Sequence, residues 1–243
     1  MSHPLRLREM APDDVALAIA ANPRLIVPAA TCEHHGRHLP LGCDALIVER
    51  LADDLSAEFR IVTAPTIAYG VNADTARLLP GGASLRRKTL RRLLNDLLLD
   101  WEKAGVEEFL VLTAHGHAPH QEALTTVLTD RARVRVVDIF SIDFGDVLES
   151  PDGPIHGGEV DTSLMLYVAP QLVRMDLARD SILPERERRR YRRGTRMLLP
   201  GASDGSVGEP TRASAEKGAR LYAFIRDRIR ERVLGAAPRV IPA

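Results

Sequence analysis

Short apolar segments with strand-like composition alternate along this chain with longer segments that have helical spacing. Residues 24–30, 108–113 and 134–140 are apolar runs that contain β-branched residues and are bounded by polar or small ones. The segment 85–103 lies between two of these runs and repeats leucine at intervals of three and four residues. We also expect a strand at 59–65 and a helix from about 121 to 131. Strands that alternate with helices predict an α/β fold with a mostly parallel central sheet.

Histidine-rich loops follow two of the predicted strands. Residues 33–44 come after the strand at 24–30 and read Glu-His-His-Gly-Arg-His-Leu-Pro-Leu-Gly-Cys-Asp. Residues 115–120 come directly after the strand at 108–113 and read His-Gly-His-Ala-Pro-His. The carboxyl ends of parallel strands share one edge of a sheet, and ligands of open α/β folds bind there. We therefore expect the two loops to converge on one site.

The first loop has the residue types of a metal site. Glu33 and His35 are two positions apart, so in extended backbone their side chains point the same way. Asp44, at the start of the next predicted helix, could close the site. Carboxylate oxygens and imidazole nitrogens are common ligands of zinc and neighbouring divalent ions. The alternative for Asp44 is a structural role as the N-cap of that helix.

A third motif, residues 155–163, precedes an apolar helical segment. It contains His156 and Glu159 beside two glycines, an unusual setting for core residues. Asp161 and Thr162 are open to a plainer interpretation as caps of the following helix.

Composition limits the classes of function. The length of 243 residues fits a single domain spanning 1–243, and the formal net charge is +0, so a general nucleic-acid or membrane surface is not indicated. We find no signal-peptide core and no apolar run of about 18 residues. Cys32 and Cys43 could pair, but two cysteines do not form a disulfide framework. These features predict a cytoplasmic protein.

The segment 185–196 is dense in arginine. One interpretation is a site for a polyanion. Because the chain as a whole is neutral, we favour a solvated helix or a contact between subunits, and nucleic-acid binding is not expected.

Five motifs, in order, resemble those of the creatininase (creatinine amidohydrolase) family. The first loop is similar to that family's Gly-Ser-x-Glu-Gln-His-Gly-Pro-His-Leu-Pro-x-x-x-Asp signature, and the third motif is similar to His-Ala-Gly-Glu-x-Glu-Thr-Ser. The matching segments are 30–44, 69–70 with 79–82, 113–118, 156–163 and 205–218.

This resemblance implies a three-layer α/β/α fold and a site with two divalent metal ions, either zinc, manganese or iron. Members of the family hydrolyse C–N bonds in a cyclic amide, a formamide or a peptide, and they usually form homo-oligomers, often hexamers. The expected substrate is therefore a small molecule with an amide-type bond, attacked by a metal-activated water.

The resemblance also implies roles for individual residues. Glu33 and His115 would hold one metal ion, His35 would hold the other, and Asp44 would bridge them. For the remaining ligand of the second site, our own candidates are His117 and Glu159. Our candidates for the group that delivers a proton to the leaving nitrogen are His156 and Glu159.

The chain departs from the family pattern at several positions. His34 replaces a glutamine, Thr113-Ala114 replaces Asn-Gly, and His117 stands where creatininase itself has a glutamate ligand. These changes argue against creatinine as the substrate. They also leave two alternatives: a member without catalysis that binds a metal or ligand, and a non-hydrolytic iron enzyme.

Overall fold

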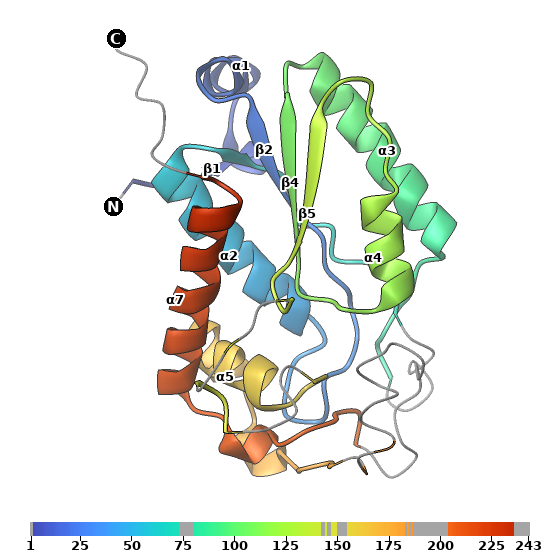
Figure 1. Cartoon of the computed structure of the whole chain (residues 1–243), viewed down its shortest axis with the longest axis vertical. Helices are drawn as coiled ribbons and strands as arrows, with labels where there is room; N and C mark the ends of the chain where they lie inside the picture. Colours follow the sequence, from blue (N-terminus) through green and yellow to red (C-terminus); the bar gives the residue numbers. More distant parts are fainter. Residues whose placement is uncertain are drawn as a thin grey trace.

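A five-stranded parallel sheet with helices on both faces forms the centre of the molecule (Figure 1). The strand order is β1-β3-β2-β4-β5, which confirms the predicted three-layer α/β/α fold. The computed structural model describes residues 2–72, 80–141, 144, 147–149, 155–182, 184, 186 and 204–235. The main elements are β1 (Leu5–Arg6), α1 (Pro12–Ala21), β2 (Arg24–Pro28), α2 (Cys43–Phe59), β3 (Val62–Thr63), α3 (Arg87–Lys103), β4 (Glu108–Thr113), α4 (Ala118–Thr125), β5 (Arg133–Asp138), α5 (Glu159–Val168) and α7 (Ala215–Arg232). Short 3-10 helices lie at Leu7–Glu9, Pro170–Leu172, Met175–Leu177 and Pro210–Arg212.

The two central strands, β2 and β4, are buried on both faces. Ile26 and Leu110 pack into the core under α2, α5 and α7, whereas Leu25 and Phe109 pack under α1, α3 and α4. Successive strand residues point to opposite faces, so a strand covered on both sides must be apolar at every position. This explains why these segments are continuous apolar runs in the sequence.

Helix α3 shows the clearest agreement with the sequence pattern. Leu90, Leu94 and Leu98 recur every four residues and are fully buried against the sheet. Gly105 follows the C-cap residue Ala104 and has a φ of 102°, a conformation that glycine adopts without steric cost. The predicted helix end is therefore confirmed.

Helices α5 and α7 approach each other very closely. A Cβ atom on Gly218 of α7 would overlap the carbonyl oxygen of Ser163 on α5, so glycine is required at this contact. The Oγ atom of Ser214 accepts a hydrogen bond from the Lys217 amide and caps α7. The C-terminal helix thus fixes the position of α5, which carries the third motif.

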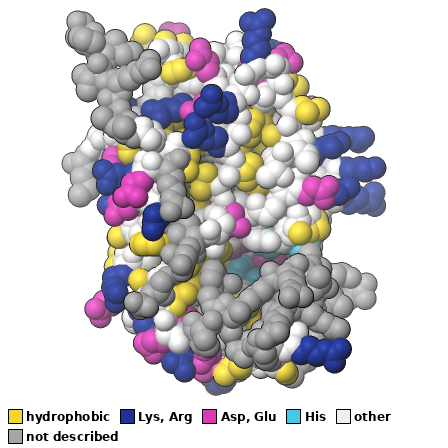
Figure 2. Space-filling view, in the orientation of Figure 1, with side chains coloured by type: hydrophobic (Ala, Val, Ile, Leu, Met, Phe, Trp, Pro, Cys, Tyr) yellow, Lys and Arg dark blue, Asp and Glu magenta, His cyan; other side chains and the backbone are white. Residues whose placement is uncertain are grey.

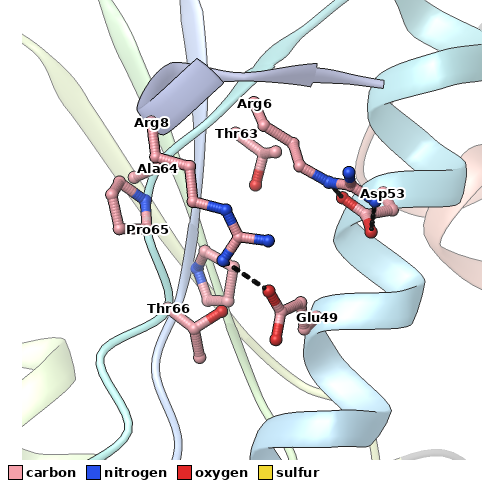
Figure 3. A pocket seen from close by; sticks show the side chains of 9 residues that line it. Arg6, Arg8, Glu49, Asp53, Thr63, Ala64, Pro65 and Thr66 are labelled. Atoms are coloured by element: carbon pink, nitrogen blue, oxygen red, sulfur yellow. Dashed lines mark hydrogen bonds and ion pairs between the residues drawn. The ribbon is translucent and has the colours of Figure 1, made fainter. Parts of the chain in front are cut away.

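Ion pairs attach the N-terminal segment to α2 beside a small surface pocket (Figure 3). Arg6 donates two hydrogen bonds to the carboxylate of Asp53, at 2.9 and 2.7 Å, and Arg8 donates one to Glu49 at 3.0 Å. Both guanidinium groups of this pocket therefore already have carboxylate partners.

Some predicted boundaries were wrong. The strand predicted at 59–65 is shorter, because α2 continues to Phe59 and leaves β3 with Val62 and Thr63 only. The helix predicted at 121–131 forms earlier, at Ala118–Thr125, since proline is well accommodated in a first helical turn.

Two other expectations concern membrane-spanning segments and the arginine-rich segment. No helix among the described residues is long and apolar enough to cross a membrane. The arginine-rich segment 185–196 lies outside the described residues except for Arg186.

Candidate metal centre

Loops from the carboxyl edge of the sheet bring acidic and histidine side chains together. Glu33 Oε1 lies 2.9 Å from His115 Nδ1, and His35 Nε2 lies 3.1 Å from Asp44 Oδ1. All four residues are buried. In the space-filling view, only a small area of histidine surface is visible, next to an acidic side chain (Figure 2).

Asp44 is held at the start of α2, where its charge is favoured. It is the second residue of that helix, whose N-cap is Gly42, so the interpretation of Asp44 as the cap was wrong. Its Oδ2 atom accepts a hydrogen bond of 2.6 Å from Thr31 Oγ1. The partial positive charge of a helix N-terminus stabilises a carboxylate in this position.

The third motif reaches the same site through a tight turn. Gly157 has a φ of 66°, and a Cβ atom there would lie 2.5 Å from the backbone oxygen of His35. Glycine therefore allows this turn to pack directly on the first loop. His156, immediately before the turn, stacks on His35 with ring centroids 4.2 Å apart.

Three imidazoles of the cluster share one arrangement: one ring nitrogen faces a backbone carbonyl, and the other faces a carboxylate. The outward contacts are His35 Nδ1 to Glu33 O (3.4 Å), His115 Nε2 to Val71 O (3.1 Å) and His156 Nε2 to His34 O (2.5 Å). A carbonyl oxygen only accepts, so each outward nitrogen carries the proton. In a neutral ring the inward nitrogen is then unprotonated. Histidines that bind metals are held in this way.

One oxygen of each carboxylate that faces these nitrogens has no hydrogen-bond partner. Glu33 Oε1 and Asp44 Oδ1 are buried and accept no hydrogen bond. A buried carboxylate oxygen without a partner is costly, and its lone pairs repel those of an unprotonated nitrogen. A cation between them would remove both penalties. The residues present therefore fit a divalent metal ion.

The possible ligand atoms form overlapping groups, and within each group all ligand atoms lie within 4.8 Å of one another. Asp44 connects two of them, because its Oδ1 faces His35 and its Oδ2 lies 3.4 Å from His115. The groups are Glu33 with Asp44 and His115, Glu33 with His35 and His156, and His35 with Cys43 and Asp44.

Cys43 is the weakest of these candidates. Burial is the largest cause that raises the pKa of its thiol well above the usual value, and the nearby acids raise it further. A thiol binds metals as the thiolate, so the carboxylates are better ligands here. Neither Cys43 nor Cys32 forms a disulfide, so they do not pair.

The electrostatics of the cluster favour positive charge. Burial lowers the pKa of His35, but Asp44, Asp161 and Glu33 together outweigh it and raise that pKa to about 9. The pKa of His115 is likewise raised. Burial raises the pKa of Glu33 and of Asp44, but the neighbouring histidines outweigh it, and both pKa values lie below the usual range. A site that attracts protons this strongly also attracts metal cations.

Comparison with known proteins identifies the family. The sequence model described as "Creatininase: Creatinine amidohydrolase" matches residues 8–233. The chain belongs to the creatininase family. A mycofactocin precursor peptide peptidase from Mycolicibacterium smegmatis is 30% identical over 235 residues, which cover 90% of this chain and 84% of that protein.

Solved creatininase structures share the fold. One described as "Creatininase Mn" superposes with a TM-score of 0.75 at 21% identity, over 94% of this chain and 98% of that one. A variant creatininase described as "Zn-Zn type" has a TM-score of 0.76 at 22% identity, over 95% and 98%. As a member of the creatininase family, the chain is a hydrolase that acts on C–N bonds.

Two residues that we considered as further metal ligands lie outside the ligand groups of the described residues. His117 is the N-cap residue of α4, and its ring centroid is 5.9 Å from that of His115. Glu159 instead accepts hydrogen bonds from Lys217 Nζ at 2.6 Å and from the Glu149 amide at 3.1 Å. His156 lies nearer to the carboxylates than either of them, with its Nδ1 atom 3.6 Å from Glu33 Oε1.

Asp161 has a role that the sequence did not indicate. The N-cap of α5 is Gly158, so the interpretation of Asp161 and Thr162 as caps was wrong. Asp161 Oδ2 accepts a 2.6 Å hydrogen bond from the Gly157 amide and so holds the turn after His156. Burial raises the pKa of Asp161 to about 6.

Thr162 is likewise bound elsewhere, because its Oγ1 lies 2.9 Å from His38 Nε2. A separation of four residues between Gly157 and Asp161 is the only clue in the sequence to the hydrogen bond that holds the turn.

Proposed function

We propose that this chain is a metal-dependent amidohydrolase that uses two divalent ions to cleave an amide bond of a peptide. The observation that carries the proposal is the arrangement of His35, His115 and His156: in each ring one nitrogen is held by a backbone carbonyl, and the other faces a carboxylate of the buried cluster. Zinc, manganese or iron would suit these ligands.

The ligand groups support a division between two ions. Glu33 and His115 would hold one ion, His35 would hold the other, and Asp44, which faces both His35 and His115, would be shared between them. Two such ions, when bound, would supply an activated water and polarise the carbonyl of the substrate. The protein contributes rigid imidazoles and a buried setting in which charges interact strongly.

His156 is our candidate for proton transfer. Its Nε2 proton is held by the His34 carbonyl, so Nδ1, 3.6 Å from Glu33 Oε1, is the atom that exchanges protons. Burial, followed by the charge of His35, lowers the pKa of His156 to about 4, so its ring is neutral at pH 7. It would first accept a proton from the attacking water and then donate it to the leaving nitrogen.

Sequence similarity to a characterised relative supports a peptide substrate. The relative at 30% identity is described as a peptidase that acts on a precursor peptide. His34 and His117 depart from the pattern of creatininase, which argues against creatinine as the substrate.

A single domain across 1–243, a homo-oligomeric assembly and a cytoplasmic location remain predictions of the sequence.

The first experiment measures metal by elemental mass spectrometry on protein purified without chelator. Two equivalents per chain, with hydrolysis of synthetic peptides that stops on chelation and returns with zinc or manganese, would support the proposal. Absence of metal after reconstitution would favour a protein that binds ligands without catalysis. Iron together with oxygen consumption would point to a non-hydrolytic enzyme.

A further inference from the structure

A fully buried histidine, His120, lies next to His115 of the candidate metal centre. Its ring meets that of His115 edge to face, with centroids 5.0 Å apart and planes at 85°. It belongs to none of the ligand groups of the described residues. The Gly70 backbone passes so close that a Cβ atom there would lie 2.5 Å from the His120 ring. A buried polar ring in such tight surroundings needs partners for both of its nitrogens.

The first partner is Val71. Its backbone amide donates a 3.2 Å hydrogen bond to His120 Nδ1, and its carbonyl accepts the 3.1 Å hydrogen bond from His115 Nε2. One residue thus joins the two rings. Any shift of Val71 would move the acceptor that orients His115.

The second partner is Thr113, at the end of β4. Its Oγ1 atom lies 3.2 Å from His120 Nε2 and also accepts a 3.2 Å hydrogen bond from the His115 amide. Since Nδ1 of His120 accepts from Val71, its proton is on Nε2 and is donated to Thr113. The four residues form a closed ring of hydrogen bonds.

We propose that His120 is a positioning residue for the metal centre. It holds Val71 and Thr113, and these two residues hold the ring and the backbone of His115. The His115 ring therefore keeps its Nε2 proton on the Val71 carbonyl and holds Nδ1 toward Glu33 and Asp44, where a metal ion would bind. This inference rests on the proposed function, in which His115 is a metal ligand.

Three substitutions separate the two links. His120→Asn keeps an acceptor near the position of Nδ1 for Val71, whereas His120→Gln keeps a donor near the position of Nε2 for Thr113. His120→Phe keeps the ring shape and loses both. Because Val71 contacts the His115 ring itself, we expect the asparagine variant to retain zinc affinity. The glutamine and phenylalanine variants should lose about tenfold or more, the usual cost of a lost outer partner.

The measurement is a competition titration with zinc alone against a chromophoric chelator. Thermal unfolding of the metal-free variants runs in parallel. A second readout is nitrogen-15 NMR of the zinc-loaded protein, in which the Nε2 proton of His115 should exchange slowly with solvent. In the phenylalanine variant that proton should exchange faster.

Equal zinc affinity and equally slow exchange in all three variants would overturn the inference, even if their melting temperatures fell. Affinity retained by the glutamine variant but lost by the asparagine variant would overturn the assignment to Val71. His115→Ala is the reference. If it binds zinc as the wild type does, the proposed metal centre fails, which is a different result from failure of the His120 role alone.

Discussion

The Glu33 carboxylate and the His115 imidazole lie 2.9 Å apart, although they follow different strands. The register explains this proximity. Pro28, the last residue of β2, pairs with Leu112 near the end of β4, so both loops leave the sheet at the same level. The parallel pairing of these two adjacent strands therefore brings Glu33 and His115 together.

Replacement of Asp44 should remove metal from the centre. Asp44→Asn removes one negative charge from a carboxylate placed between two histidines, and we expect metal content to fall from two equivalents to one or none. The amide hydrolysis rate should fall at least a hundredfold. Elemental mass spectrometry and a peptide assay measure both. Glu49→Gln, on the same helix but paired with Arg8, is the matched control and should retain metal and activity.

His156→Gln should slow catalysis without releasing metal. General acid–base groups contribute about 10²- to 10⁴-fold to rates, so kcat should fall within that range. The pH profile of kcat should also lose one limb. A loss of one metal equivalent would instead identify His156 as a ligand beside Glu33 and His35, and would contradict the role in proton transfer.

Glu159→Gln should retain both metal equivalents. The Glu159 side chain is buried and bound to Lys217, so loss of its charge weakens an ion pair and not the metal cluster. Hydrogen bonds to charged groups contribute about 1.5–3 kcal/mol, and we expect the free energy of unfolding to fall by about that amount. Urea unfolding and metal analysis check the two parts. Reduced metal content in a folded variant would restore Glu159 as a ligand.

The metal-free protein should lose stability in mild acid partly through His38. Burial, followed by the charge of His35, lowers the pKa of His38 to about 4, below the value of about 6.5 in an unfolded chain. Between these values the unfolded chain binds a proton that the folded one does not, so stability falls as pH falls from about 6.5 to 4.

One such group contributes a slope of up to about 1.4 kcal/mol per pH unit. His38→Gln keeps a donor near Thr162 and cannot titrate, so its slope should be smaller by that amount. Urea unfolding in the presence of chelator, from pH 4.5 to 7.5, gives both slopes. Parallel curves for variant and wild type would contradict the prediction.

Much of the fold was predictable because it depends on local periodicity. Continuous apolar runs predicted β2 and β4, and leucines every three or four residues predicted α3. Helix boundaries were less predictable, as at α4, where Pro119 permits a start before the predicted residue 121. The predicted helix caps were wrong because both carboxylates have other partners. Asp44 accepts a hydrogen bond from the Thr31 side chain, and Asp161 accepts one from the Gly157 amide.

By itself, the sequence determined the α/β fold and the approximate place of the site, since strand spacing and the position of histidines after strands are local properties. Tertiary structure alone decided which candidates face the cluster. His156 does so because the Gly157 turn packs on the His35 backbone. Glu159, three residues later, faces Lys217 from the distant helix α7, and no local pattern could reveal that partner.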